Sequence, residues 1–241
     1  MKKRIVVIAL VVALVATCFA GTFAYLTDKD AAVNVMTLGK VDIVQNEQQR
    51  GENGELVDFV QDKPAYPAVG EIDWAPDEEA LPMPGGKMLV FDEGLENVVD
   101  KFVSVSNIGK SNAYVRTIIA IEDPVDANDR VHVNINDEVG VDVSDWSTIV
   151  VDGVTYSYKV FTYTDALAPG YTTPYSLAQV FLDSEATNED CAKFGEAWEI
   201  VALSQAVQAD GFADAQTALD TAFGAVTDAA TAEWVKAVIE G

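Results

Sequence analysis

The stretches DKFVSVSNIG (100–109) and NAYVRTIIAIED (112–123) decide the fold of this chain. In the first stretch apolar residues alternate with polar ones, and in the second aromatic and β-branched residues dominate. Alternation with a period of two residues and enrichment in β-branched residues are both typical of strands. A turn signal at Asn107–Gly109 separates the two stretches. The centre of the chain is therefore predicted to form β-strands.

The sequence after residue 130 continues this pattern in shorter runs. Four runs have the composition or alternation of strands: VHVNIN (131–136), STIVV (147–151), TYSYKVFTYT (155–164) and TPYSLAQVFLD (173–183). Asp152-Gly153 is a hairpin signal between two of them. Several short strands separated by turns predict a mainly β, jelly-roll-like antiparallel β-sandwich. We expect its aromatic core residues, such as Phe102, Tyr114 and Phe181, to serve only in packing.

Two segments differ in composition from the predicted strands. From Asn46 to about Met88 the chain is rich in proline, glycine and acidic residues, which predicts a long irregular insertion (46–88) with one short strand near 56–60. After Gly211 apolar residues recur at helical spacing, which predicts a helical appendix (212–240). Thr227 and Asp228 provide an N-cap for its second helix. We expect residues 25–241 to form a single domain.

The N-terminus has the pattern of a signal peptide. Three basic residues precede an apolar run that ends in small residues near Ala24, so cleavage is predicted between Ala24 and Tyr25. A retained signal anchor is an alternative, because the apolar run approaches the ~20 residues that span a bilayer. A lipoprotein attached at Cys18 is a second alternative, although Thr17 fits the lipid-attachment pattern poorly.

Charge and cysteine content exclude several classes of protein. Cleavage would remove residues 1–24 with their three positive charges, so the formal net charge of −24 would become −27. A surface this acidic repels phosphates and anionic lipids, which argues against nucleic-acid binding and against electrostatic membrane binding. Only Cys191 would remain, so no intramolecular disulfide can form. We expect a secreted protein that touches the membrane only through its signal peptide before cleavage.

The residues needed for common enzyme sites are missing from the sequence. His132 is the one histidine, whereas zinc hydrolases usually use two or three. Alternation places His132 on the strand face of Arg130 and Asn134, where we expect it to face solvent. No Gly-x-Ser-x-Gly motif supports serine catalysis. Cys191 follows two acidic residues that disfavour its thiolate. We therefore expect no enzyme activity and no cofactor.

Clusters of acidic residues raise the question of a cation site. Carboxylate oxygens suit Ca²⁺, but none of the clusters has the order of an EF-hand loop. If a weak Ca²⁺ site exists, Asp123, Asp126 and Asp129 are the first candidates. The simpler interpretation is a set of solvated acidic loops.

The stretch TFAYLTDKDAAVNVMTLGKVDI (22–43) resembles the N-terminal region of the TasA/camelysin family, exported proteins of Gram-positive bacteria whose signal peptides are cut by a dedicated signal peptidase. Ala24–Asp28 and Met36–Ile43 carry this match. Four later segments resemble the family in the same order: MPGGK (83–87), FVSVSNIGKSNAYVR (102–116), ALAPGYTTPYSLAQVFLD (166–183) and AVQADGF (206–212). The resemblance implies sandwich turns at Pro84-Gly85 and Pro169-Gly170.

The resemblance also implies a function. In fibre-forming relatives the mature N-terminal segment leaves its own subunit and adds as a strand to the next, which builds an extracellular matrix or biofilm fibre. The corresponding assembly segment here contains Tyr25, Leu26, Val33, Val35 and Met36. The implied partners are further copies of the chain, the signal peptidase during export, and an accessory anchoring protein. The alternative is that residues 25–44 pair within their own sandwich.

Two other functions remain open from the sequence. A monomeric surface adhesin or ligand-binding module would use the 46–88 insertion, with Tyr66 and Trp74, as its binding surface. A metalloprotease, as described for camelysin-like proteins, is the less favoured alternative, because a single histidine cannot rebuild the usual metal site.

Overall fold

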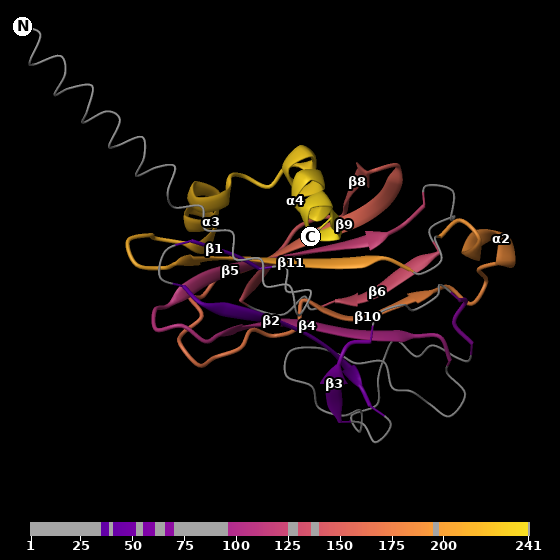
Figure 1. Ribbon diagram of the computed structural model, residues 1–241, viewed down its shortest axis with the longest axis horizontal. Helices are drawn as coiled ribbons and strands as arrows, with labels where there is room; N and C mark the ends of the chain where they lie inside the picture. The colour runs from indigo at the N-terminus through magenta and orange to yellow at the C-terminus, as the bar shows by residue number, and fades with distance from the viewer. Residues whose placement is uncertain are drawn as a thin grey trace, which may run out of the picture. The chain divides into compact units, whose positions relative to one another are not determined.

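The computed structural model describes residues 35–38, 41–51, 55–60, 66–69, 96–124, 130–135, 140–194 and 198–240. These residues all belong to one compact unit, Val33–Gly241. They form two β-sheets that pack together, with helices on one side (Figure 1). The prediction of a mainly β protein with a short C-terminal helical appendix is confirmed.

The first sheet has six strands in the order β1-β11-β5-β9-β7, and β8 also pairs with β9. Their bounds are β1 (Val35–Leu38), β5 (Ala113–Glu122), β7 (Val141–Val143), β8 (Ser147–Val151), β9 (Val154–Tyr163) and β11 (Ile200–Gln208). The β1–β11 pair is parallel, and the other pairs of this sheet are antiparallel.

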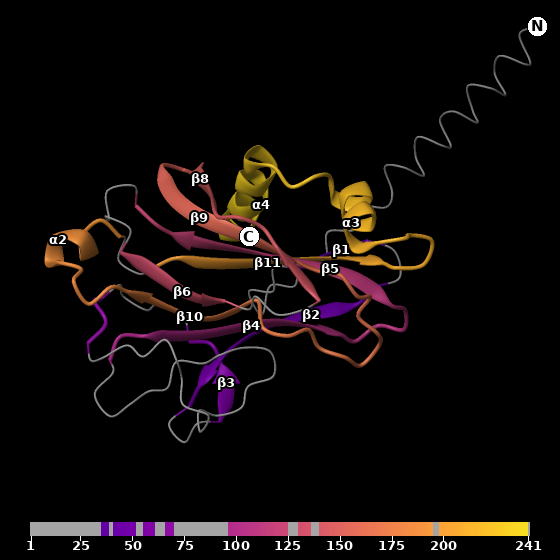
Figure 2. The same cartoon turned by 180° about the vertical axis from the view of Figure 1, so that it is seen from behind.

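The second sheet has five strands in the order β3-β2-β4-β10-β6, all antiparallel. Their bounds are β2 (Ile43–Arg50), β3 (Leu56–Asp58), β4 (Val99–Asn107), β6 (Val131–Ile135) and β10 (Leu177–Leu182). Figure 2 shows this sheet from behind, with β6, β10 and β4 below the strands of the first sheet.

Apolar side chains from both sheets form the core between them. Val103 and Leu177 of the second sheet pack with Ile119 and Phe161 of the first. The alternation in β4 explains this placement, because every second residue of a strand points to the same face. Full burial of each such side chain contributes about 1.5–3 kcal/mol, so this layer holds the sheets together.

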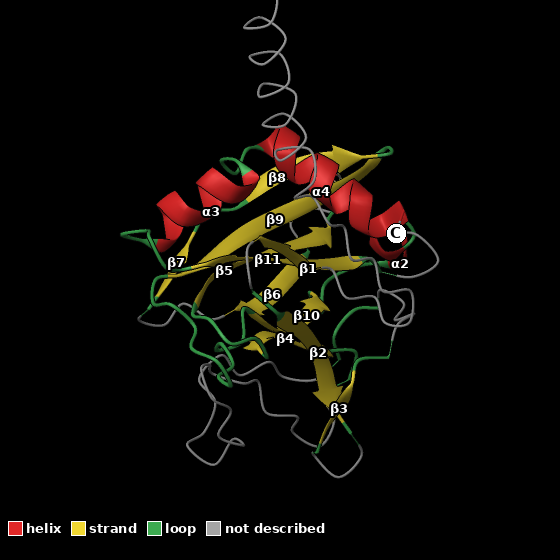
Figure 3. Ribbon diagram, turned by 60° about the vertical axis from the view of Figure 1, so that its left-hand side comes forward, coloured by secondary structure: helices red, strands yellow, loops and turns green. Residues whose placement is uncertain are grey.

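Helices cover the outer face of the first sheet. Helices α3 (Ala215–Phe223) and α4 (Asp228–Glu240) lie against β11, β5 and β8, as Figure 3 shows in red. Ile118, Ala120 and Val235 belong to the apolar cluster beneath α4. Because both faces of the sheet are covered, β5 is buried at nine of its ten positions. This double burial explains why its sequence is apolar at most positions on both faces.

Several local predictions are confirmed. Asp152 and Gly153 have φ of 49° and 91° and form the tight turn between β8 and β9. The Thr227 hydroxyl accepts a hydrogen bond from the Ala230 backbone N–H at 3.2 Å, as an N-cap does. Asp214 caps α3 in the same way, although no cap was predicted for this helix.

Three local predictions need correction. The irregular insertion was predicted to start at Asn46, but β2 continues to Arg50. Its polar residues find partners in β4, where Arg50 Nε donates to the Asp100 carboxylate at 2.5 Å. The short strand β7 lies within NDEVGVDVSD (136–145), one of the acidic clusters that were interpreted as solvated loops. Helix α2 (Asn188–Cys191) was not predicted, and it is stabilised by a capping box between Thr187 and Asp190.

The three aromatic residues predicted to pack do so, but outside the layer between the sheets. Phe102 is buried with Ala178 and Tyr175, and Phe181 is buried with Ala68 and Val98. Tyr114 packs beneath α3. Alternation along a strand predicts that two faces exist, but only the tertiary structure shows that both are covered.

Alkaline pH is expected to destabilise this fold through Tyr163. Burial raises the pKa of Tyr163 to about 12, and its hydroxyl donates to the Pro174 carbonyl at 2.9 Å. The folded state thus holds this proton more tightly than the unfolded state, whose pKa is about 10. The contribution is complete below pH ~10 and is lost as the pH rises to ~12, by roughly 2–3 kcal/mol. Urea unfolding from pH 8 to pH 12 measures the loss.

Tyr163→Phe provides the control for this prediction. Burial also raises the pKa of Tyr156, Tyr158 and Tyr175, so the variant should keep part of the alkaline loss. Its unfolding free energy should nevertheless fall less steeply above pH ~10 than that of the unsubstituted protein. Equal slopes for the two proteins would contradict a role for Tyr163.

Candidate assembly site

The N-terminal strand β1 lies at the edge of the first sheet. It pairs in parallel with β11, from Val35 opposite Ser204 to Leu38 opposite Val207. Val35 and Met36 of the predicted assembly segment therefore pair within their own chain in this structure. This arrangement matches the alternative of own-subunit pairing for these residues. Shortly after β1 the chain enters the second sheet, where Val41 and Ile43 are buried.

Beyond β1, half of the β11 edge has no strand partner among the residues that the structure describes. Strand β1 covers Ser204–Val207 and leaves Ile200–Leu203. In an antiparallel pair, successive residues point their N–H and C=O groups alternately toward the partner and away from it. The Glu199 carbonyl accepts from Glu122, so it points toward β5. The backbone groups of Ile200 and Ala202 therefore point to the open side.

At the other end of β1, three segments that resemble the family meet around Asp42, Asn107 and Gly170. We call this meeting point the junction. The Asp42 carbonyl accepts hydrogen bonds from the backbone N–H groups of Ile108 and Gly109, at 3.0 and 2.9 Å. A Cβ atom on Gly109 would lie 2.9 Å from the Asp42 backbone nitrogen. The Asn-x-Gly turn thus needs glycine because of this close approach.

Asn107 is the centre of this junction and is fully buried. Its Nδ2 atom donates to the carbonyls of Ser111 and Leu167 at 2.9 and 2.8 Å, and its Oδ1 atom accepts from Gly109 N–H at 3.0 Å. Its backbone N–H donates to the Tyr171 carbonyl at 2.9 Å. One side chain thereby connects the end of β4 to two other turns.

The predicted turn at Pro169-Gly170 also belongs to the junction. Gly170 has a φ of 81° and donates its N–H to the Asn107 carbonyl at 2.8 Å. Thr173 then pairs with Val105, because its hydroxyl accepts from the Val105 N–H at 3.0 Å and its own N–H donates to the Val105 carbonyl at 2.9 Å. Segments 60 or more residues apart in sequence are therefore connected by hydrogen bonds.

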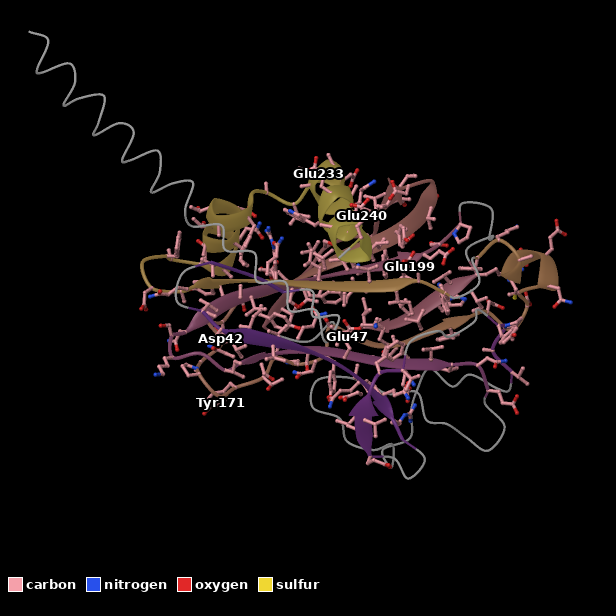
Figure 4. All side chains as sticks on the ribbon, viewed as in Figure 1. Asp42, Glu47, Tyr171, Glu199, Glu233 and Glu240 are labelled. Atoms are coloured by element: carbon pink, nitrogen blue, oxygen red, sulfur yellow. The ribbon has the colours of Figure 1, made fainter. Side chains whose placement is uncertain are left out.

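The junction has an exposed apolar rim. Ile108 is 58% exposed and Tyr171 is 67% exposed. Figure 4 shows Asp42 and Tyr171 at the same end of the sheets, with Glu199 toward the opposite end. The junction and the open half of the β11 edge thus lie at opposite ends of β1.

A chain of polar side chains crosses the core next to the open edge. Gln45 of β2 accepts from the Ser204 hydroxyl at 2.7 Å, and Ser204 lies 3.1 Å from the Thr117 hydroxyl. Beside it Lys101 forms a salt bridge with Glu47, and its ammonium group lies 4.0 Å from the Phe59 ring centroid. Buried polar groups stabilise a structure when they are paired, and here the pairing fixes the position of one sheet on the other.

Sequence reasoning assigned no role to this polar chain. The available signal was the spacing of Ile43, Gln45 and Glu47, which share one strand face. A polar residue on an apolar face indicates a partner, but the partners on β11 and β5 lie more than 70 residues away in sequence.

The candidate Ca²⁺ site is only partly described. Asp123 accepts a hydrogen bond from the Ser157 hydroxyl at 2.6 Å, while Asp126 and Asp129 lie outside the described residues. Within the described ranges, no group of three or more His, Cys, Asp or Glu side chains could hold a metal ion.

His132 and Cys191 have structural surroundings. His132 Nε2 lies 3.1 Å from the Asp183 carboxylate, and the ring stacks on Phe181. The side chain is thus partly buried, whereas a solvent-facing residue was predicted. A backbone N–H of Glu185, and then His132, lower the pKa of Asp183. Burial, and then the charge of Asp190, raise the pKa of Cys191, which agrees with the predicted weak nucleophile.

Other predicted residues lie outside the described part of the chain: Ala24, Tyr25, Leu26, Val33, Trp74 and the Pro84-Gly85 turn. Tyr66 is described and is 55% exposed. Among the described helices, none is long and apolar enough to cross a membrane.

Comparisons with known proteins find no matching family model, no matching curated protein and no matching solved structure.

Proposed function

We propose that this chain is an exported structural subunit of a bacterial extracellular matrix or surface fibre, and that the N-terminal segment of one copy adds as a strand to the next copy. The observation that carries this function is the β11 edge, where the described residues of β1 pair with Ser204–Val207 and no described strand pairs with Ile200–Leu203. Exposed strand edges accept further strands through their backbone hydrogen bonds. The backbone groups of Ile200 and Ala202 face the side of β11 that an added strand would occupy.

The pairing of β1 defines which part of this edge a donated strand could use. Pairing with β1 begins at Ser204, so a donated strand has residues 200–203 of β11 to pair with. Four ladder hydrogen bonds contribute about 4 kcal/mol net, whereas ordering a ten-residue tail costs at least ~10 kcal/mol. Burial of apolar residues such as Leu26 and Val33 must therefore supply part of the binding free energy.

The junction suggests where the donated segment leaves its own subunit. Val41 and Ile43 are buried in the core, and the Asp42 carbonyl is held by two hydrogen bonds. These contacts hold the chain immediately after β1. We therefore assign residues 25–34 as the donated segment, while β1 stays with its own subunit.

The resemblance to the TasA/camelysin family agrees with this function. The segments of this chain that resemble the family around Asp42, Asn107 and Gly170 meet in the junction, which supports a common structural role for them. Export through a signal peptide cut after Ala24 by a dedicated signal peptidase would release the donated segment. An accessory protein would anchor the fibre to the cell. No catalytic role is assigned to the chain.

Negative-stain electron microscopy of residues 25–241 beside residues 35–241 tests this function. The shorter protein keeps β1 and all the described contacts but lacks the donated segment. We expect filaments from residues 25–241 and monomers from residues 35–241. Incubation with and without Ca²⁺ separates strand addition from cation bridging of the acidic surface.

Other outcomes of this experiment favour other functions. Filaments from both proteins would contradict assembly through the N-terminal segment. Monomers in both samples would contradict a fibre subunit and favour a monomeric adhesin, with exposed Tyr66 as the first residue to test for ligand contact. Proteolysis that a chelator abolishes would favour the camelysin-like metalloprotease.

A further inference from the structure

The open half of the β11 edge is occupied at one point by a side chain from the facing sheet. Gln45 of β2 is 5% exposed, and its Nε2 atom donates to the Ala202 carbonyl at 3.2 Å. Its Oε1 atom accepts from the Ser204 hydroxyl at 2.7 Å. Ser204 is the residue at which pairing with β1 begins. Gln45 therefore contacts β11 at Ser204, the first residue that pairs with β1, and at Ala202, two residues before it.

The chemistry of this contact resembles strand pairing. A glutamine side chain ends in an amide, with the same N–H donor and C=O acceptor as a peptide group. Ala202 directs its carbonyl to the open side, where an added strand would supply a backbone N–H. The Gln45 amide therefore occupies a hydrogen-bonding position that strand addition would require.

The two hydrogen bonds from Gln45 Nε2 differ in strength. The bond to the Glu47 carboxylate is 2.7 Å long and charge-assisted, whereas the bond to the Ala202 carbonyl is 3.2 Å long and neutral. If another donor takes the Ala202 carbonyl, Gln45 keeps Glu47 as a partner. Displacement therefore breaks the weaker bond and does not leave the buried amide without a partner.

We propose that Gln45 closes the half of the β11 edge that no described strand covers, and that residues 25–34 of a second copy displace it from Ala202 during assembly. This inference rests on the proposed function. Unpaired edges invite pairing with wrong partners, and natural proteins protect them. A buried side-chain amide provides such protection while it remains displaceable.

The test compares assembly rates of residues 25–241 with and without substitutions at Gln45, followed by light scattering and electron microscopy. Gln45→Met removes the amide at similar length. Gln45→Asn keeps an amide but shortens the side chain by one methylene, so that it no longer reaches Ala202. Both variants should assemble about five-fold faster, the factor that corresponds to one net hydrogen bond. Circular dichroism confirms that each variant is folded.

Gln48→Met is the matched control. Gln48 lies on the same strand, between β3 and β4, and is also partly buried. Its substitution should leave the assembly rate within about two-fold of the unsubstituted protein, because it does not contact the β11 edge.

The outcomes separate this inference from the proposed function. If all proteins form filaments and the Gln45 variants assemble no faster than the Gln48 control, Gln45 does not close the edge. If no protein forms filaments, including the unsubstituted chain, the fibre function fails and the displacement of Gln45 fails with it. Faster assembly in the two Gln45 variants alone supports the assignment.

Discussion

Arg116→Met is expected to lower the free energy of unfolding by about 3–4 kcal/mol, because it removes the side chain that holds the C-terminal helices on the sheet. Arg116 is fully buried in β5, within an otherwise apolar run. Its Nη1 atom donates to Asp220 of α3 at 2.8 Å, and its Nη2 atom donates to the Gly224 carbonyl at 3.0 Å. Nε donates to Gln205 of β11 at 2.5 Å.

The size of this effect follows from what the substitution leaves behind. Removing one partner of a buried ion pair leaves the other charge without compensation, and this usually costs 3–5 kcal/mol. Asp220 is 31% exposed, so water compensates part of the loss. Burial lowers the pKa of Arg116, and the hydrogen bond and charge of Asp220 oppose this shift.

Urea unfolding measures the loss of stability, and hydrogen exchange of residues 215–240 locates it. Arg130→Met is the matched control, because Arg130 pairs with the exposed Glu185 and should contribute less than about 1 kcal/mol. If Arg116→Met and Arg130→Met lower stability equally, the helices do not depend on Arg116. The Trp234 ring, 5.4 Å from the guanidinium carbon, provides a fluorescence probe of the same contact.

Asn107→Ala is expected to cost about 3–5 kcal/mol of unfolding free energy. The substitution removes the two hydrogen bonds from Nδ2 and the one to Oδ1 that connect the turns of the junction. Each buried group left without its partner costs about 1–3 kcal/mol. The Leu167 carbonyl keeps one hydrogen bond, from the Ala113 N–H, so leaving it without Asn107 costs less free energy than leaving the Ser111 carbonyl without Asn107.

Asn107→Asp gives a sharper version of the same test. A carboxylate has nearly the shape of the amide but cannot donate, so an acceptor would face the carbonyls of Ser111 and Leu167. We expect a loss of stability at least as large as for alanine, and a partial recovery at low pH as the carboxyl group protonates. Asn188→Ala, at an exposed position of α2, should stay within about 0.5 kcal/mol. A loss below about 1 kcal/mol for Asn107→Ala in urea unfolding would contradict its role.

Much of the fold is predictable from local patterns. The turn at Asp152-Gly153 follows from the need for positive φ at two successive residues. The strands around Phe102 and Tyr114 follow from alternation and β-branched content, and the caps at Asp214 and Thr227 follow from helix-end chemistry. These features depend on neighbours in the chain, so the sequence carries their full signal.

The candidate site was less predictable for a physical reason. The family resemblance pointed to the segments around Asp42, Asn107 and Gly170, but it did not predict the hydrogen bonds that join them. The extent of β2 was missed because Asn46, Glu47 and Arg50 have the composition of a polar loop until their partners on β4 are known. Burial of a polar residue is favourable only when its partner is in place, and that partner lies far away in sequence.

The sequence by itself determined the mainly β class, the helical end of the chain and the hairpin turn, because each depends on local spacing. Only the tertiary structure decided that β1 pairs in parallel with β11, that Arg116 donates to Asp220 of α3 and that Gln45 reaches the Ala202 carbonyl. These contacts join residues roughly 90 to 170 positions apart, and their stability depends on the packed sheets that exclude water from them.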